Sequence, residues 1–209
     1  MFSNKESVNL SAEGHLKIWD VESGDVLLNK RNAINPENLS IAMVNMLGNK
    51  NIHSMYEMHF GNGGTIIDNL GVISYKTPNV NGQSEDLYNP TFYKVIDAES
   101  PLNTDPNKNY MTVEHINGTN YTDLIINCVL DYTEPSATDN VFNLAGVAQD
   151  ATDNAADFSG SFVFDEVGLK SKGAGLNEGF LLTHVTFHPV QKSANRLLQV
   201  RYTVRIRVG

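Results

Sequence analysis

The sequence LLQVRYTVRIRVG closes the chain at residues 197–209, and its residues alternate in character. One set is apolar or aromatic: Leu198, Val200, Tyr202, Val204, Ile206 and Val208. The other set is polar: Gln199, Arg201, Thr203, Arg205 and Arg207. A period of two residues is typical of a β-strand that buries one face. The segment therefore predicts a strand whose outer face carries three arginines and no acid.

Several segments before it also predict strands. Two of them directly precede the last one: SFVFDEVGL (161–169) and GFLLTHVTFHPV (179–190). Nearer the N-terminus, residues 14–34 contain two apolar-rich runs around the short turn sequence ESGD, which is typical of a hairpin. Asn117-Gly118 is a second hairpin signal between two apolar runs.

One segment, NPENLSIAMVNMLGNK (35–50), predicts a helix of about three turns. Asn35 can cap it, Pro36 suits the first helical position, and Gly48 can end it. Its expected apolar stripe consists of Leu39, Met43 and Met46 or Leu47.

These elements predict a mainly β protein: an antiparallel, jelly-roll-like β-sandwich with one short helix near the N-terminus and long loops. We expect one domain over residues 1–209, because a chain of this length can bury a sizeable core without disulfides. A middle loop or hairpin region at about 68–108 and an acidic loop at about 133–160 interrupt the strands. Long polar loops of this kind often carry binding.

Charge and composition exclude several classes of function. The net charge of −9 argues against a general nucleic-acid binder, but residues 170–209 contain seven bases and a single acid. No apolar run is long enough for a membrane helix, and the N-terminus lacks a signal-peptide pattern. The single cysteine, Cys128, follows the alternation of an apolar strand and is expected to be a buried, inert thiol.

The sequence offers little that points to catalysis, a metal or a cofactor. The GNGG loop (61–64) lacks the Lys-Ser/Thr pair of a phosphate-binding loop and is interpreted as a turn. His184 and His188 lie on a predicted strand, where four residues span roughly 13 Å, too far for one ion. Asp165 and Glu166 point to opposite faces of a strand unless a bulge intervenes, so we expect no acid and base pair there. We therefore expect a protein without enzymatic activity.

The arginine face allows three interpretations. Arg201, Arg205 and Arg207 can pair across the sheet with carboxylates such as Asp123 or Asp131. They can also form a strip about 20 Å long that binds an acidic segment of the same chain or of a second copy. DNA phosphates are the third candidate, but the acidic remainder of the chain repels phosphates and disfavours nucleic acid as a partner. The expected interface set also contains Lys192, Arg196 and, from the acidic loop, Asp150, Asp153 and Asp157.

Two stretches of the chain resemble a known group of proteins. FDEVGL, followed by GFLLTHVTFHPVQKSANRLLQVRYTVRIRV, resembles the C-terminal half of virion structural proteins of tailed bacteriophages, especially small neck, tail, baseplate and fibre-adaptor components. GHLKIWDVESGDVLLNKRNAINPENLSIAMVNML is similar to the hairpin and helix of such proteins. Together these stretches cover less than half of the chain, and they contain no catalytic signature.

The resemblance implies a subunit of a ring at the neck or tail of a virion that assembles in the host cytoplasm. Its partners would be copies of itself and other virion proteins, such as portal, neck, tail or fibre proteins. One alternative is a carbohydrate-binding module that uses Tyr88, Phe92 and Tyr93 on the middle loop. Another is a polysaccharide hydrolase, which would need carboxylates clustered in a cleft.

Overall fold

The computed structural model describes residues 8–50, 52–132, 134–135 and 161–209. The strands are β1 (Leu10–Asp20), β2 (Val26–Ile34), β3 (Met55–Gly61), β4 (Thr65–Ile67), β5 (Ile73–Tyr75), β6 (Pro90–Val95), β7 (Tyr110–His115), β8 (Tyr121–Leu130), β9 (Ser161–Ser171), β10 (Leu181–Ser193) and β11 (Leu198–Val208). The helix of the described part is α1 (Pro36–Leu47). The expectation of a mainly β, antiparallel protein with one short helix is confirmed.

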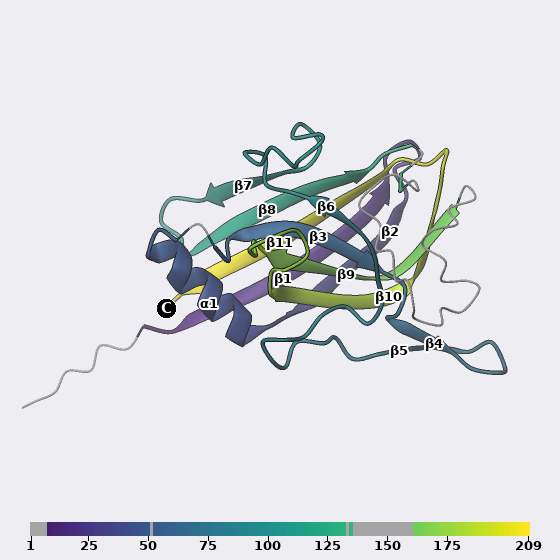
Figure 1. Cartoon of the computed structure of the whole chain (residues 1–209), viewed down its shortest axis with the longest axis horizontal. Helices are drawn as coiled ribbons and strands as arrows, with labels where there is room; N and C mark the ends of the chain where they lie inside the picture. Colours follow the sequence, from purple (N-terminus) through teal and green to yellow (C-terminus); the bar gives the residue numbers. More distant parts are fainter. Residues whose placement is uncertain (1–7, 51, 133, 136–160) are drawn as a thin grey trace, which may run out of the picture.

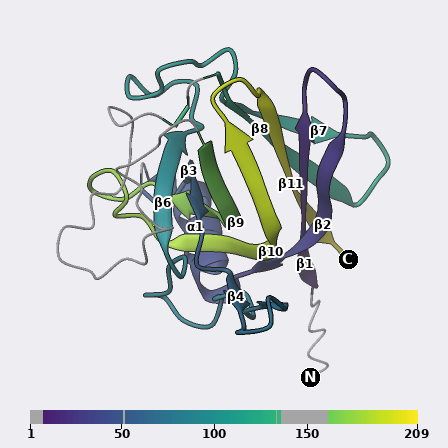
Figure 2. The same cartoon turned by 90° about the vertical axis from the view of Figure 1, so that its right-hand side faces the viewer.

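Nine strands form a single sheet in the order β6-β3-β9-β10-β2-β1-β11-β8-β7. Two register pairs, Thr183 with Ile34 and His184 with Ala33, connect β10 to β2. This short connection lets the sheet curl, so that β6-β3-β9-β10 and β2-β1-β11-β8-β7 face each other as two layers (Figure 1). Figure 2 shows the strands surrounding a common interior, with α1 at the far end. The arrangement is consistent with the predicted sandwich, although one sheet supplies both layers.

Apolar side chains from both layers meet in one core. Phe60 of β3 and Phe187 of β10 each contact the ring of Phe164 of β9 edge to face, with ring centroids 5.4 and 5.8 Å apart. From the facing layer, Ile18 and Tyr202 join the same cluster and are fully buried. Aromatic rings bury large areas, so this cluster contributes much of the favourable free energy of folding.

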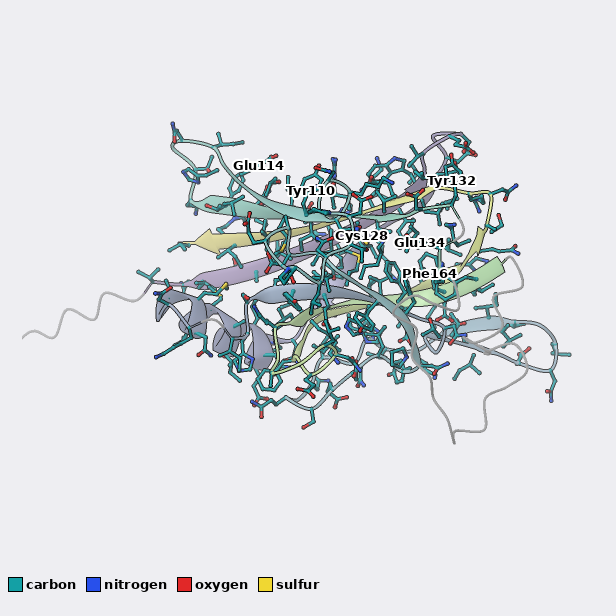
Figure 3. All side chains as sticks on the ribbon, turned by 45° about the horizontal axis from the view of Figure 1, so that its top comes forward. Tyr110, Glu114, Cys128, Tyr132, Glu134 and Phe164 are labelled. Atoms are coloured by element: carbon teal, nitrogen blue, oxygen red, sulfur yellow. The ribbon has the colours of Figure 1, made fainter. Side chains whose placement is uncertain are left out.

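Cys128 lies on β8 within this core, near the middle of the molecule (Figure 3). Burial raises the pKa of its thiol to about 12. The thiol is therefore protonated and unreactive at neutral pH, as the sequence predicts.

A buried lysine connects the edge strand β6 to β8 of the facing layer. Lys94 lies on the edge strand β6, and its Nζ donates to the backbone oxygen of Val129 on β8 at 2.9 Å. The same Nζ forms an ion pair with Glu134 at 2.6 Å. A carboxylate and a carbonyl this close to the ammonium group offset much of the free-energy cost of removing that group from water.

Helix α1 covers one end of the layers and begins as predicted. The Asn35 side chain accepts from the Asn38 backbone nitrogen at 3.1 Å, and Gly48 is the C-cap. The expected apolar stripe is only partly correct, because the buried residues are Asn38, Leu39 and Ala42. Met46 and Leu47 are 50% and 86% exposed. The second half of the helix therefore lies outside the core.

The middle region contains a hairpin and a segment that packs back on the sheet. Strands β4 and β5 pair to form the hairpin, which projects from the body at the lower right of Figure 1. The chain then crosses the outer side of β9 and β10. There the Lys170 Nζ contacts Asp86 at 2.8 Å, and the Asn79 backbone nitrogen donates to the His184 Nδ1 at 2.7 Å. Residues 76–89 are therefore held against the sheet.

Glu166 is the centre of these contacts. Its Oε1 accepts from the backbone nitrogens of Gly63 and Asn89 at 3.1 and 2.8 Å. Its Oε2 accepts from the Tyr88 nitrogen at 3.0 Å and lies 2.9 Å from the His184 Nε2. Because Nδ1 of His184 accepts a hydrogen bond, Nε2 carries the proton and donates to the carboxylate. Glu166 and His184, which are both fully buried, together with Lys170 form what we call the polar clamp.

A bulge next to the polar clamp brings the adjacent carboxylate to the same loop. Phe164 and Val167 both face the core although they are three residues apart, so β9 changes its alternation between them. Asp165 accepts from the Gly64 nitrogen at 2.7 Å and from the Thr65 hydroxyl. Burial raises the pKa of Asp165, and these donors oppose the rise. The GNGG loop is thus a turn fixed by two carboxylates.

We expect Glu166→Gln to lower the free energy of unfolding by about 2–3 kcal/mol, because an amide nitrogen would face N–H donors at a buried position. Hydrogen exchange at the Tyr88 and Asn89 amides should accelerate, since both donate to this carboxylate. The matched control is Glu99→Gln at an exposed position. Equal stabilities of the two variants in urea unfolding would show that the polar clamp is unimportant.

Candidate interaction surface

The three predicted arginines lie on the outer face of the layer β2-β1-β11-β8-β7. Directly paired residues of antiparallel strands point to the same face, so the registers define it. Arg201 pairs with Lys17 on β1 and with Asn127 on β8. Five cationic side chains belong to this surface, which we call the cationic face: Lys17, Arg31, Arg201, Arg205 and Arg207. Three acidic side chains share it: Glu13, Glu114 and Asp123.

Arg205 has an acidic partner within the sheet. Its Nε and Nη2 each donate to a carboxylate oxygen of Asp123 at 2.7 Å, and its guanidinium lies 3.9 Å from the ring centroid of Tyr121. The hydrogen bonds from Arg205 lower the pKa of the Asp123 carboxyl. The expected pairing with Asp123 is confirmed, so Arg205 holds β11 to β8. Asp131, the other expected partner, pairs instead with Lys108.

Arg201 has no acidic partner among the described residues. Its Nε donates to the Asn127 Oδ1 at 3.2 Å, and its guanidinium lies 5.6 Å from the ring centroid of Trp19. The Nζ of Lys17 lies 5.2 Å from the same ring. Lys17 and Arg201 carry like charges on neighbouring strands and repel each other. The ring of Trp19 attracts both through cation–π contacts, which oppose this repulsion. An approaching anion would relieve this repulsion.

Arg207 is intermediate between Arg205, which has a close acidic partner, and Arg201, which has none among the described residues. Its Nη1 lies 3.9 Å from the Glu13 carboxylate, and both side chains are close to half exposed. An exposed pair at this distance contributes little to stability. Arg201 and Arg207 are therefore the arginines of the predicted strip that are available for an intermolecular contact.

An open pocket of about 280 Å³ lies on the cationic face. It is lined by Glu13, Gly14, His15, Arg31, Thr203 and Arg205. Thr203 is short and lies between the longer side chains of the paired strands, which creates the depression. Arg31 is exposed at its rim and forms no ion pair among the described residues. The pocket can receive a small acidic group, such as a carboxylate of a partner protein.

Two other predicted interface cations have internal roles. Lys192 is 1% exposed, so its prediction as a surface contact is wrong. Its Nζ donates to the Ser193 backbone oxygen at 3.0 Å, and burial lowers its pKa to about 8. Arg196 pairs with Asp20 at 2.9 Å and donates to the Gln191 backbone oxygen, which fixes the turn between β10 and β11. The predicted contacts Asp150, Asp153 and Asp157 lie outside the described residues.

The remaining candidate sites do not assemble. His184 is buried in the polar clamp while His188 is exposed, so the two do not share a ligand. Among the described residues, no group of three or more His, Cys, Asp or Glu side chains is placed to hold a metal ion. Phe92 belongs to the core, whereas Tyr93 stacks on His59. The proposed carbohydrate-binding aromatics therefore do not form one exposed platform.

Sequence reasoning missed the contribution of β1 to the cationic face. The alternation of HLKIWD (15–20) places His15, Lys17 and Trp19 on one face, which is a readable signal. What the sequence did not supply is the register that sets this face beside the arginines of β11. Edge strand β7 adds Tyr110 and Glu114, which Figure 3 shows along that strand. Trp, Tyr and Arg are the residue types that dominate binding energy in protein interfaces.

Comparison of the chain with protein-family models, with curated proteins and with solved structures finds no match. None of the helices in the described part of the chain is long and apolar enough to cross a membrane.

We expect Arg205→Met to lower the free energy of unfolding at pH 7, because it removes a bidentate, partly exposed pair. Asp123 has a lowered pKa in the folded state, so this contribution is present above the ordinary carboxyl pKa and is lost as the pH falls through the folded value. A double-mutant cycle with Asp123→Asn in urea measures the coupling. Strictly additive effects at pH 7 would contradict the pairing.

Lys192 gives a second dependence on pH. Its folded pKa of about 8 lies below the ordinary lysine value, so the unfolded chain binds more protons from about pH 8 to about 10.5. The free energy of unfolding therefore gains a positive slope in this range from Lys192, and Lys192→Met should remove it. The exposed Lys50→Met is the control and should keep the slope of the parent. Parallel profiles for all three proteins would show that Lys192 is charged and solvated in the fold.

Proposed function

We propose that this chain is a non-catalytic structural subunit of a tailed-phage virion. In this proposal it forms or joins a ring at the neck or tail through contacts with copies of itself and with other virion proteins. The observation that carries the proposal is the cationic face, a broad exposed sheet surface with Trp19, Arg201 and Lys17 on an otherwise acidic chain.

The electrostatics of this face support an acidic protein partner. The cationic face has five bases and three acids at its strand positions, whereas the whole chain has a net charge of −9. A surface that differs in sign from its own chain favours docking against an acidic surface in one orientation. The same net charge disfavours DNA, because the acidic remainder of the protein repels phosphates.

The chemistry of the interior supports a structural role as well. The buried acids Asp165 and Glu166 accept hydrogen bonds from loop backbone, which positions those loops. Long side chains such as Lys94 and Lys170 likewise bridge segments that are distant in sequence. Polar contacts of this kind fix the positions of the loops relative to the sheet. A subunit of an assembly needs such fixed positions for its contact surfaces. The resemblance of residues 164–169, 179–208 and 14–47 to phage virion proteins supports the proposed location.

The test uses Lys17→Glu/Arg201→Glu, which reverses two cations of the cationic face that share the ring of Trp19 and have no acidic partner among the described residues. The probe is a labelled peptide of residues 134–160, which carries five acids and no base. We expect the parent protein to bind it more weakly as salt rises, and the double variant to bind about tenfold less tightly. Fluorescence anisotropy at low and high salt measures both effects.

The control is Lys50→Glu/Lys172→Glu, which changes the net charge equally away from the cationic face. It should bind the peptide like the parent. Mass spectrometry of particles made from the genome that encodes the chain tests the location directly. Absence of the chain from purified particles, together with equal peptide binding by both variants, would contradict the proposal.

A further inference from the structure

The hairpin of β4 and β5 carries an unusual set of exposed apolar side chains. Five of them are between 54% and 89% exposed: Ile66, Ile67, Leu70, Val72 and Tyr75. The single charged residue between Gly64 and Tyr75 is Asp68. We call this element, residues 65–75, the apolar arm. Monomeric proteins rarely expose apolar side chains in such a group, which therefore marks a contact surface.

Hydrogen bonds hold the tip and the base of the projecting apolar arm. At its tip, Asp68 Oδ1 accepts from the Leu70 and Val72 nitrogens at 2.8 and 2.9 Å. At its base, the Gly64 nitrogen donates to Asp165 at 2.7 Å, and the Gly64 oxygen accepts from the Lys76 nitrogen at 2.9 Å. An arm held in one conformation loses little entropy on binding, so its apolar surface contributes efficiently to affinity.

A second apolar surface lies at the opposite end of the molecule. Its five side chains are between 44% and 86% exposed: Leu10, Val44, Leu47, Val113 and Val208. Leu10 and Val208 are register partners at the start of β1 and the end of β11. Val113 lies on the inner side of the edge strand β7. Val44 and Leu47 belong to the part of α1 outside the core. We call this set the apolar end face; α1, the start of β1 and the ends of β7 and β11 are all at the left end of the molecule in Figure 1.

We propose that the apolar arm of one copy binds the apolar end face of the next copy, so that the chain assembles head to tail. The two surfaces lie at opposite ends of the longest axis and cannot cover each other within one chain (Figure 1). A head-to-tail contact lets every copy of a closed ring bury both surfaces. A two-fold contact between arms would leave every end face exposed.

The sizes of the two surfaces fit this contact. At these exposures each aliphatic or aromatic side chain offers about 60 Å², so the two sets together offer about 600 Å². Because apolar atoms supply about 60% of a typical interface, the whole contact would be near 1,000 Å². That area is at the lower limit for specific association, so ring closure would strengthen a contact that is weak between two copies.

This inference rests on the proposed function only for its setting in a ring, and it is tested separately. The experiment mixes two variants, Leu70→Cys and Leu47→Cys, with a short bismaleimide cross-linker. Cys128 is buried and protonated, so the introduced thiols are the reactive ones. We expect cross-linked dimers in the mixture, with residue 70 joined to residue 47, and at most traces with either variant alone. Peptide mass spectrometry identifies the joined positions, and Val113→Cys serves as a second receiving position.

Sedimentation velocity across protein concentrations gives the second readout. Leu70→Ser should weaken self-association at least tenfold, whereas Val21→Ser, which removes an exposed valine from the β1–β2 turn, should not. Equal melting temperatures would show that both variants fold. A monomer at all concentrations, or cross-links between two residues 70 in place of the mixed product, would overturn the head-to-tail contact. Peptide binding by Leu70→Ser should stay at the parent level, which separates this result from failure of the cationic face.

Discussion

The alternation of β11 is the constraint on which both faces of its layer depend. This strand pairs with β1 along its whole length and with β8 along most of it. The pairing on both sides fixes the face of the sheet to which each of its side chains points. Val200, Tyr202 and Val204 are at most 3% exposed, and burying each contributes about 2 kcal/mol. A slip of one residue would bring arginines into the core. Core packing therefore fixes the positions of the outer arginines.

The local elements of this fold could be predicted, because their signals lie within a few residues. The strands at 161–169, 179–190 and 197–209, the Asn117-Gly118 hairpin and the Asn35 helix cap are all confirmed. Burial of polar residues could not be predicted, because it depends on segments far away in sequence. Glu166 is buried because residues 88 and 89 donate to it, and Lys192 is buried although its sequence neighbours are polar.

The two apolar surfaces show a different limit of sequence reasoning. The run GTIIDNLGVISY (64–75) contains an Asp-Asn-Leu-Gly turn between two apolar pieces, which is a readable hairpin signal. Apolar composition alone predicts burial, however, and here five of these side chains are exposed. The same holds for α1, where Leu47 fits an apolar stripe but extends past the sheet. Only the tertiary arrangement distinguishes an apolar segment of the core from one at a contact surface.

The cationic face and the apolar arm respond oppositely to salt. Screening weakens attraction between Arg201, Lys17 and an acidic surface, because the charges are exposed and the Debye length falls below about 8 Å above physiological salt. Apolar burial at Leu70 is not screened in this way, and excluded salts such as sulfate strengthen it. In the proposed assembly, apolar burial would form the ring and electrostatic attraction would attach it to a neighbour. Each contact can be formed or released while the other stays intact.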